Sequence, residues 1–299
     1  VLVSGSSGFL GSALLPRLRA SGHQVMRLVR RRRGETPPGA RAWDPDEDDL
    51  DPRAFDGVDA VVHLGGASIG SVWTERRKAL LRSSRIRTTR LLAEVMATAP
   101  VRPSVFVHAS GVGYYGDRGD EILTESSSPG QGFLADLCRD WEAASIAAEN
   151  AGVRVVRLRT GLVFSRQGGV LPLLLRPFRL GLGGRLGSGR QWMSWIALED
   201  VVRVYERALT EKTLRGAVNA VAPQPVTNAA FTQALARAVG RPPLLPVPEF
   251  AIRMIPGRMG EETLLASQRA VPEALLRAGY SFEASTVEEA LAAPRATSP

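Results

Sequence analysis

Three glycines near the start of the chain have the spacing of a phosphate-binding turn. Gly5, Gly8 and Gly11 follow the strand-like residues 1–4 and open a helical stretch. In such a turn the first glycine permits a tight bend, the second lets backbone N–H groups approach a pyrophosphate, and the third lets the helix lie close to the sheet. The N–H groups and the partial positive charge at the helix start attract the phosphates. We therefore predict dinucleotide binding, with an ordinary glycine-rich turn as the alternative. The predicted contacts are Gly5, Ser6, Ser7, Gly8, Phe9, Leu10 and Gly11.

An arginine run follows the second predicted strand, where dinucleotide-binding proteins distinguish between their cofactors. An NAD enzyme places Asp or Glu there to bind the ribose 2′-hydroxyl. This chain has arginine at positions 30–33 and no carboxylate before Glu35. A guanidinium grips a 2′-phosphate in a fork, whereas a carboxylate would repel it. We predict NADP(H) as the cofactor, with Arg30 as the first candidate and Arg31 as the second. The rest of the run fits a solvated basic turn.

Small residues follow the end of another strand that we predict to be buried. His63 is followed by Leu64, Gly65 and Gly66, and small residues at the end of a strand let a cofactor pass over the sheet edge. Leu64, Gly65 and Gly66 therefore join the predicted contacts. No neighbour in the sequence marks a catalytic partner for His63, so we interpret it as a packed histidine.

Short β-branched runs that alternate with longer amphipathic stretches must position these residues. This alternation predicts an α/β fold, a Rossmann-like doubly wound parallel sheet. We expect strands at 1–4, 24–29, 60–64, 104–109 and 153–159, and helices at 9–21, 74–98, 134–151, 228–239, 260–269 and 272–278. The glycine-rich residues 168–189 indicate an irregular insertion. We assign 1–168 plus 191–228 to the NADP-binding domain and 169–190 plus 229–299 to a smaller C-terminal substrate or cap domain, with substrate in the cleft between them.

The composition limits the classes of partner. At 299 residues and 44% hydrophobic, the chain can bury a full core, and no apolar run approaches the roughly 18 residues of a membrane span. The net charge of +8 is carried almost wholly by dispersed arginine, with two lysines. No aromatic-interleaved basic motif appears, so we expect no nucleic-acid partner. The expected partner is an unidentified small-molecule substrate, and a homodimer is left open.

Cysteine content and the chain start bear on cellular context. The single cysteine, Cys138, excludes an internal disulfide and suits a reducing cytoplasm. We expect no secretion signal, because no basic segment followed by an apolar stretch opens the sequence. The first residues already read as a strand, which fits trimmed residues or a removed upstream domain. No His/Cys/Asp cluster has metal-ligand spacing, so we expect no metal.

Taken together, the motifs resemble the extended short-chain dehydrogenases/reductases, whose members include nucleotide-sugar epimerases and dehydratases. More narrowly, the chain resembles the atypical "epimerase family protein" branch, which has a small C-terminal domain. The resemblance covers essentially the whole chain. The motifs that carry it are Gly5-x-x-Gly8-x-x-Gly11, His63-Leu-Gly-Gly, Ser84-Arg85, Ser110-Gly-Val-Gly-Tyr-Tyr-Gly116, Cys138-Arg-Asp-Trp-Glu142, Pro177-Phe-Arg-Leu-Gly, Gly187-Ser-Gly-Arg-Gln191, Trp195-Ile196, Asn219-x-x-Ala222-Pro223 and Leu264-Leu-Ala-Ser-Gln268.

One departure from the family pattern concerns proton transfer. The resemblance implies a Tyr-x-x-x-Lys pair on one helix face, yet no tyrosine of this chain precedes a lysine by four residues. Aligning Glu142 with the glutamate that commonly follows the pair puts Leu134 and Cys138 in the two places. We interpret Cys138 as a small packed hydrophobe.

Other residues are candidates for the missing proton donor and for binding. Tyr114, Tyr115 and Ser110 follow a strand whose end would face the nicotinamide, although the two tyrosines equally fit a packed turn that lines the pocket. The resemblance implies backbone contacts from Leu162 and Val163 to the nicotinamide amide. The predicted substrate contacts are Arg185, Arg190 and Gln191, with a solvated loop as the alternative.

Two functional hypotheses remain. In the first, the protein is an NADP(H)-dependent oxidoreductase or epimerase that acts on a small carbonyl or nucleotide-sugar compound with a relocated proton donor. In the second, catalysis has been lost and the protein is an NADPH-dependent binding or regulatory module, because a fold of this kind does not guarantee chemistry.

Overall fold

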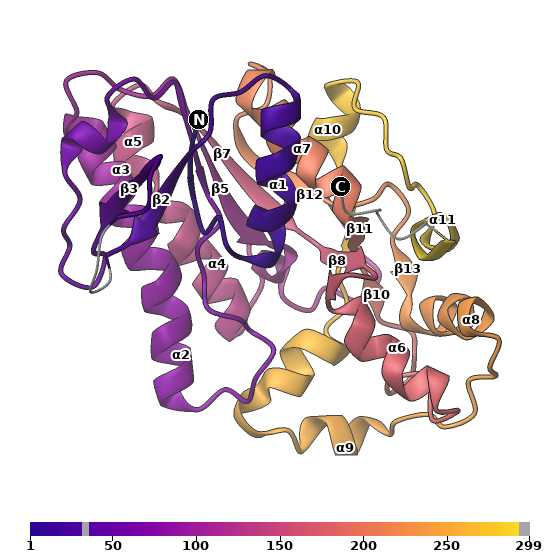
Figure 1. Cartoon of the computed structure of the whole chain (residues 1–299). Coiled ribbons are helices and arrows are strands. Elements are labelled where there is room, and N and C mark those ends of the chain that lie inside the picture. The colour runs from indigo at the N-terminus through magenta and orange to yellow at the C-terminus, as the bar shows by residue number, and fades with distance from the viewer. Residues whose placement is uncertain (32–35, 293–299) are drawn as a thin grey trace.

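A seven-stranded parallel sheet forms the centre of the computed structural model, which describes residues 1–31 and 36–292 (Figure 1). The strand order is β3-β2-β1-β4-β5-β7-β12, and it reverses direction between β1 and β4. This arrangement confirms the predicted Rossmann-like sheet. The strands are β1 (Leu2–Ser4), β2 (Met26–Arg30), β3 (Ala40–Trp43), β4 (Ala60–His63), β5 (Val105–Gly111), β7 (Arg154–Thr160) and β12 (Gly216–Ala220).

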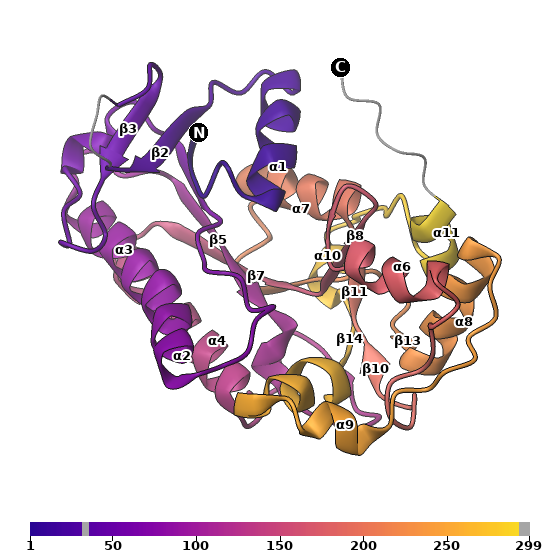
Figure 2. The same cartoon turned by 60° about the horizontal axis from the view of Figure 1, so that its bottom comes forward.

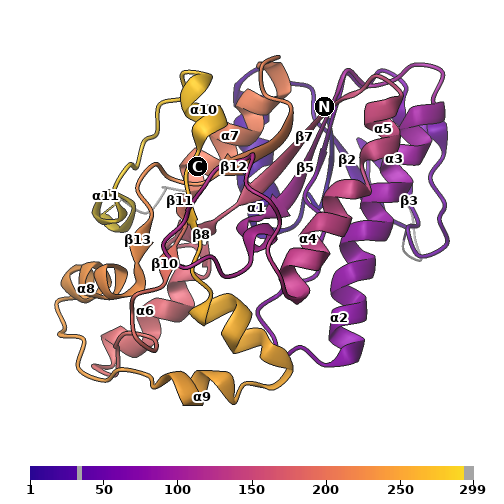
Figure 3. The ribbon, with the colours of Figure 1, turned by 180° about the vertical axis from the view of Figure 1, so that it is seen from behind.

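Helices bury both faces of this sheet, and alternating side chains along each strand supply the two cores. On β4, Val62 packs with α1 (Phe9–Ala20) and α7 (Leu198–Thr210), whereas Val61 packs with α3 (Thr88–Thr98) and α5 (Ile146–Asn150). Figures 1 and 3 show these two helical layers from opposite sides. Because both faces are covered, the central strand β4 and the first half of β5 are apolar nearly throughout.

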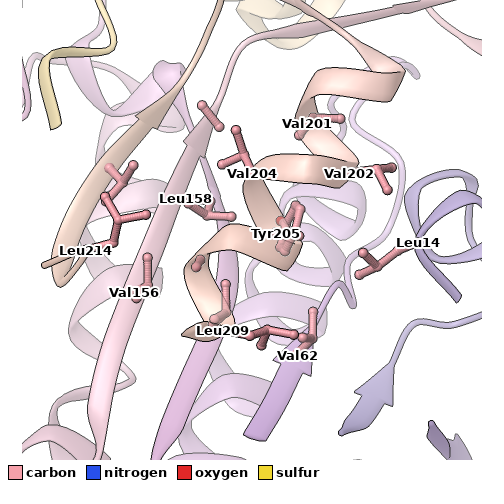
Figure 4. Close-up of a cluster of buried hydrophobic side chains, with 14 of the residues drawn as sticks. Leu14, Val62, Val156, Leu158, Val201, Val202, Val204, Tyr205, Leu209 and Leu214 are labelled. Atoms are coloured by element: carbon pink, nitrogen blue, oxygen red, sulfur yellow. The ribbon is translucent and has the colours of Figure 1, made fainter. Parts of the chain in front are cut away.

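Helix α7 provides much of the first core. Val201, Val204, Tyr205 and Leu209 recur at helical spacing and lie against Val62, Val156 and Leu158 of the sheet (Figure 4). Each fully buried side chain of this size contributes about 1.5–3 kcal/mol. The sequence analysis assigned no helix to this segment, although the spacing of its apolar residues is that of an amphipathic helix.

A long helix predicted over residues 74–98 is confirmed, with an irregularity at its middle. Helix α2 (Glu75–Arg82) passes through a π-helical turn at Ser83–Arg87 into α3. Its start is capped by Thr74, whose hydroxyl accepts a hydrogen bond from Arg77 N at 3.2 Å. Single π-helical turns inside α-helices occur frequently at functional sites.

The helix predicted over residues 134–151 is divided in two. Helix α4 (Phe133–Ala143) ends before α5 begins at Ile146. The hydroxyl of Ser145 donates to Glu142 O at 2.8 Å, which competes with the helical hydrogen-bond pattern at this point.

A smaller body packs beside the end of the sheet (Figure 2). Stacked Phe164, Trp195 and Phe231 form its aromatic core, with ring centroids 5.5 and 5.2 Å apart. Its elements are β8 (Leu162–Ser165), β9 (Gly168–Gly169), β11 (Trp195–Ala197), β10 (Trp192–Met193), β13 (Val226–Thr227), α6 (Leu171–Arg179), α8 (Asn228–Val239), α9 (Glu249–Arg253) and α11 (Val287–Ala292).

The prediction of an irregular insertion over residues 168–189 is wrong for its first half. Helix α6 forms there because Leu171, Leu175 and Phe178 bury one face against the small core. Its Pro172 lies in the first turn, where a missing N–H costs little.

The chain then returns to the large domain. Strand β14 (Arg269–Ala270) pairs in parallel with β6 (Ile122–Leu123), and α10 (Glu273–Arg277) packs on β12. The buried Asp200 carboxylate accepts hydrogen bonds from Tyr280 Oη, Glu283 N and Ala284 N at 2.9–3.1 Å. This carboxylate therefore ties the C-terminal segment to the start of α7.

Across residues 1–31 and 36–292, none of the helices combines the length and the apolar character that crossing a membrane would require.

Two neighbouring histidines predict an acid-sensitive fold. His63 on β4 and His108 on β5 are fully buried, and burial lowers the pKa of each to about 3. Both side chains bind a proton more readily in the unfolded chain, so the stability that they contribute is present above pH 6.5 and is lost as the pH falls. We expect each to lower the free energy of unfolding by about 2 kcal/mol between pH 7.5 and 5.

Urea denaturation at the two pH values measures this loss. In the variant His108→Leu, the pH-dependent loss should fall to about half, because one of the two buried imidazoles no longer titrates. A free energy of unfolding that is equal at pH 7.5 and 5 in the unaltered protein would contradict the assignment.

Candidate functional site

A cleft of about 680 Å³ opens at the point where the strand order reverses; we call it the sheet-edge cleft. In open α/β sheets, ligands bind at this switch point. Nine of the predicted cofactor residues line it: Gly5, Ser6, Ser7, Gly8, Arg30, Arg31, Leu64, Gly65 and Gly66. The structure thus brings together residues from the ends of β1, β2 and β4.

Close backbone contacts shape the glycine turn. Gly5 has φ +72°, and a Cβ there would lie 2.8 Å from the carbonyl carbon of Leu64. A Cβ on Gly11 would lie 2.4 Å from Gly5 O. Helix α1 begins after Gly8 with no acidic residue in its first turn and no side-chain cap, so its positive end is not neutralised. These features fit a pyrophosphate.

Five of the predicted cofactor residues lie outside the lining of this cleft, among them Leu162, which lines a second hollow described below. The Phe9 ring packs against Gly168, where an added Cβ would lie 2.7 Å from a ring carbon. The side chains of Leu10 and Val163 pack against the main core. Gly11 contacts the turn rather than the cleft. Phe9, Leu10 and Gly11 therefore contribute no side chain to the cleft.

Arg30 and Arg31 lie at the end of β2, at the rim of the cleft. The loop after β3 offers each a carboxylate: Arg30 Nη1 is 3.6 Å from Asp46, and Arg31 Nη1 is 2.6 Å from Asp49. Both side chains are about half exposed, so these pairs are weak. A dianionic phosphate at this rim would compete with the two aspartates. Arg32 and Arg33 lie outside the described residues.

A second hollow of about 310 Å³, here called the inner cavity, lies beyond the cleft. Most of its lining is apolar. The side chains in the family's Tyr and Lys places, Leu134 and Cys138, both face it from α4. Of the residues predicted to act, Ser110 and Leu162 line it. Its wall on the side of α4 therefore carries no pair of groups that could exchange a proton near neutral pH.

Ser110 begins a buried hydrogen-bond network beside this cavity. Its hydroxyl donates to Glu142 Oε1 at 2.7 Å, and Glu142 accepts two hydrogen bonds at 2.8 Å from Arg159. Arg159 Nη1 in turn donates to Tyr115 Oη at 3.0 Å. The charges of the Glu142 carboxylate and the Arg159 guanidinium compensate each other. The group that this network presents to the cavity is therefore the neutral Ser110 hydroxyl.

The structure does not bring Tyr114 and Tyr115 to the cleft or the inner cavity. Tyr115 Oη lies 2.7 Å from Asn219 Oδ1 and 2.9 Å from Thr124 O, and burial raises its pKa to about 12. Tyr114 packs its ring 3.4 Å from the Arg159 guanidinium. This is the packed-turn arrangement that the sequence left open.

Two charged residues that sequence reasoning did not assign to the site also line the inner cavity. Arg85 comes from the π-helical turn Ser83–Arg87, and Glu262 comes from a second π-helical turn at Glu261–Leu265. The Glu262 carboxylate accepts hydrogen bonds from Phe133 N at 3.1 Å and Leu134 N at 2.9 Å, and so caps α4. Arg85 belonged to a family motif, but neither residue lay near a recognisable catalytic pattern.

A polar vestibule of about 890 Å³ continues outward from the inner cavity and shares Leu134 and Glu262 with it. Arg190 and Gln191 line it, as predicted for substrate contacts, whereas Arg185 does not. The Gln191 side chain is buried and donates to Leu186 O and Leu264 O at 3.0 Å. Arg190 is therefore the one of the three whose exposed side chain faces this space.

Two family models match separate parts of this chain. Residues 1–220 match the model of the NAD dependent epimerase/dehydratase family, and residues 247–293 match a domain of unknown function, DUF1731. An epimerase family protein of Mycobacterium leprae is 46% identical over 294 residues, which cover 97% of this chain and 94% of that protein.

Two solved structures are similar. The human epimerase family protein SDR39U1, isoform 2, determined with NADPH, has a TM-score of 0.86 and 35% identity, with 97% of each chain covered. A nucleoside-diphosphate sugar epimerase of Corynebacterium glutamicum has a TM-score of 0.80 and 39% identity. The match covers 97% of this chain but 57% of the Corynebacterium chain.

The environment of Cys138 predicts an unreactive thiol. Burial raises the pKa of Cys138 to about 12, and the thiolate is the reactive form. We expect labelling by a disulfide reagent at pH 8 to be at least about a thousand-fold slower in the folded protein than in urea. Because the chain has one cysteine, the absorbance of released thiol reports this site alone. Rapid stoichiometric labelling of the folded protein would contradict the placement.

Proposed function

The chain belongs to the NAD dependent epimerase/dehydratase family, and we propose that it binds NADP(H) in the sheet-edge cleft to reduce, oxidise or epimerise a small carbonyl or nucleotide-sugar compound held in the inner cavity. The observation that carries this proposal is the glycine turn at the strand reversal, with Arg30 and Arg31 at the far rim of the same cleft. NADPH in the solved human relative supports the same cofactor.

Residues of this chain offer the groups that the cofactor requires. The turn at Gly5 leaves backbone N–H groups and the positive end of α1 for the pyrophosphate. The two arginines provide forked donors for a 2′-phosphate. The bound cofactor would supply or accept a hydride, and the remaining requirements fall on the protein.

The inner cavity meets part of these requirements. Its mostly apolar walls lower the polarity around a reacting carbonyl. Because the Ser110 proton is directed to Glu142, the Ser110 oxygen has free lone pairs that can accept a hydrogen bond from a substrate hydroxyl. Leu134 and Cys138 cannot repeat the exchange that a Tyr-x-x-x-Lys pair performs.

One observation favours the second function, an NADPH-dependent binding or regulatory module without turnover. The two apolar side chains in the places of the family's acid/base pair face the cavity directly, so the loss of the pair leaves an intact pocket. A module of this kind would bind cofactor and a small molecule in the same two spaces.

Cofactor preference tests the two arginines. In the double variant Arg30→Gln/Arg31→Gln, we expect NADPH to bind about 10- to 100-fold more weakly, because charge-assisted hydrogen bonds of this kind contribute about 1.5–3 kcal/mol. The dissociation constant for NADH should change by less than about threefold, since NADH lacks the 2′-phosphate.

Fluorescence titration of both nucleotides gives these constants. Arg19→Gln is the matched control. This substitution also removes a positive charge, but from an exposed position on α1 that does not line the cleft. Equal losses for NADH and NADPH would reject the assignment of the arginines to the 2′-phosphate.

Turnover distinguishes the enzyme from the module. NADPH oxidation is followed over a panel of small carbonyl compounds and nucleotide sugars. If a substrate is found, Ser110→Ala should lower kcat about 10-fold or more with little change in NADPH affinity, because the hydroxyl lines the inner cavity.

Tyr115→Phe serves as the comparison. It should leave kcat within about threefold and lower the melting temperature, because the buried hydroxyl bonds only to protein groups. A panel without turnover, together with tight NADPH binding, would favour the module.

A further inference from the structure

Arg85 presents a positive charge to the inner cavity without a carboxylate partner. Among the described residues, no Asp or Glu lies within ion-pair distance of it. Its guanidinium donates to two backbone carbonyls, Ala67 O at 2.9 Å and Leu81 O at 3.3 Å. A guanidinium has five N–H donors in a fixed fork, so part of the group remains for a ligand.

Two other arginines of the large domain, Arg159 and Arg154, have their charge compensated. Arg159 forms two hydrogen bonds with Glu142. Arg154 donates to three carbonyls at the end of α7 and beyond, from Ala208, Leu209 and Leu214, where the helix dipole is negative. Neither lines the inner cavity. Since a charge removed from water is costly unless it is paired, the unpaired guanidinium of Arg85 favours an anionic ligand in this cavity.

The surroundings of Arg85 hold its guanidinium in place. Its Cζ lies 5.2 Å from the ring centroid of Trp141, whose indole N–H donates to Thr89 Oγ1 at 2.8 Å. On the other side, a Cβ added to Gly66 would lie 3.1 Å from Cζ. The π-helical turn directs this side chain inward together with Ser84, whose hydroxyl accepts from Ala67 N at 3.0 Å.

Arg85 also lies beside residues of both hollows. Ala67 and Ser84 line the sheet-edge cleft, whereas Ile69 and Arg85 line the inner cavity. A ligand that extends from the glycine turn into the inner cavity therefore passes the guanidinium. A smaller ligand confined to the inner cavity reaches the same group from the opposite side.

We propose that Arg85 binds an oxyanion of the ligand in the inner cavity. This inference rests on the proposed function, and it adds the chemical class of that ligand: a molecule that combines an apolar body with a carboxylate or phosphate group. The oxyanion has two sources, the nicotinamide-side phosphate of the cofactor or an acidic substrate, and the experiment below distinguishes them.

The test uses Arg85→Gln, which removes the charge and keeps a polar side chain, and Arg85→Lys, which keeps the charge without the fork. Arg82→Gln is the matched control: it removes a charge from the same helix, where Arg82 pairs with Asp140 outside both hollows. Thermal melting checks that all variants fold. The probes are NADPH, 2′,5′-ADP as the adenosine half alone, and acetoacetate and benzoate titrated with and without NADPH.

If the cofactor phosphate is the source, Arg85→Gln weakens NADPH binding about 10-fold or more while 2′,5′-ADP binding is unchanged, and Arg85→Lys recovers part of the loss. If an acidic substrate is the source, Arg85→Gln leaves NADPH binding unchanged. In that case the unaltered protein binds acetoacetate or benzoate, and Arg85→Gln does not.

The idea is overturned if Arg85→Gln and Arg82→Gln behave alike with every probe. If NADPH fails to bind the unaltered protein, the proposed function fails by itself. The carboxylate titrations of the cofactor-free protein then judge Arg85 separately: loss of binding in Arg85→Gln supports its role, and equal or absent binding overturns it.

Discussion

The backbone contact between the glycine turn and the end of β4 is the constraint on which the rest of the site depends. Any side chain at Gly5 would collide with the main chain of Leu64 and Gly65, and any at Gly11 with the carbonyl of Gly5. Because the obstructing atoms are backbone, neighbouring side chains cannot relieve either collision by changing rotamer. The start of α1 is thereby fixed beside the point where the strand order reverses. Buried His63 stabilises the same place through hydrogen bonds with Ser4 and Thr88.

Charge compensation then decides the character of the inner cavity. Glu142 and Arg159 neutralise each other behind Ser110, and Leu134 and Cys138 add apolar surface. Glu262 directs its carboxylate to the N–H groups that begin α4, so its charge faces the positive end of a helix. Arg85 has no such counterpart among the described residues. The electrostatic preference of the pocket consequently originates on the long helix, not on α4.

Short sequence patterns predicted those parts of the molecule whose structure depends on residues close together in the chain. The glycine turn, the five predicted strands and the long helix follow from patterns a few residues long, and nine cofactor residues meet in one cleft as expected. Helix α6 was missed because flanking glycines suggested a loop, while its apolar face needs the distant core of Phe231 and Trp195. Arg85 and Glu262 could not be singled out from the sequence. Arg85 matters because no carboxylate of the described residues pairs with it, and Glu262 matters because it caps a helix that is distant in the sequence. Tyr114 and Tyr115 were expected near the ligand by strand position alone, which does not reveal that Asn219 and Arg159 engage the Tyr115 hydroxyl.

The lining of the inner cavity bears on the direction of any hydride transfer. Oxidation of a hydroxyl requires a base to remove its proton, and epimerisation through a ketone requires a group that first removes that proton and then returns it. On α4 the relevant places hold Leu134, which has no titratable group, and Cys138, whose pKa burial raises to about 12. Ser110 can orient a hydroxyl, but its own proton is directed to Glu142. Reduction of a carbonyl makes a smaller demand, since the developing alkoxide can be protonated by water that enters from the adjoining vestibule. Within the proposed function, these residues favour reduction of a carbonyl over epimerisation.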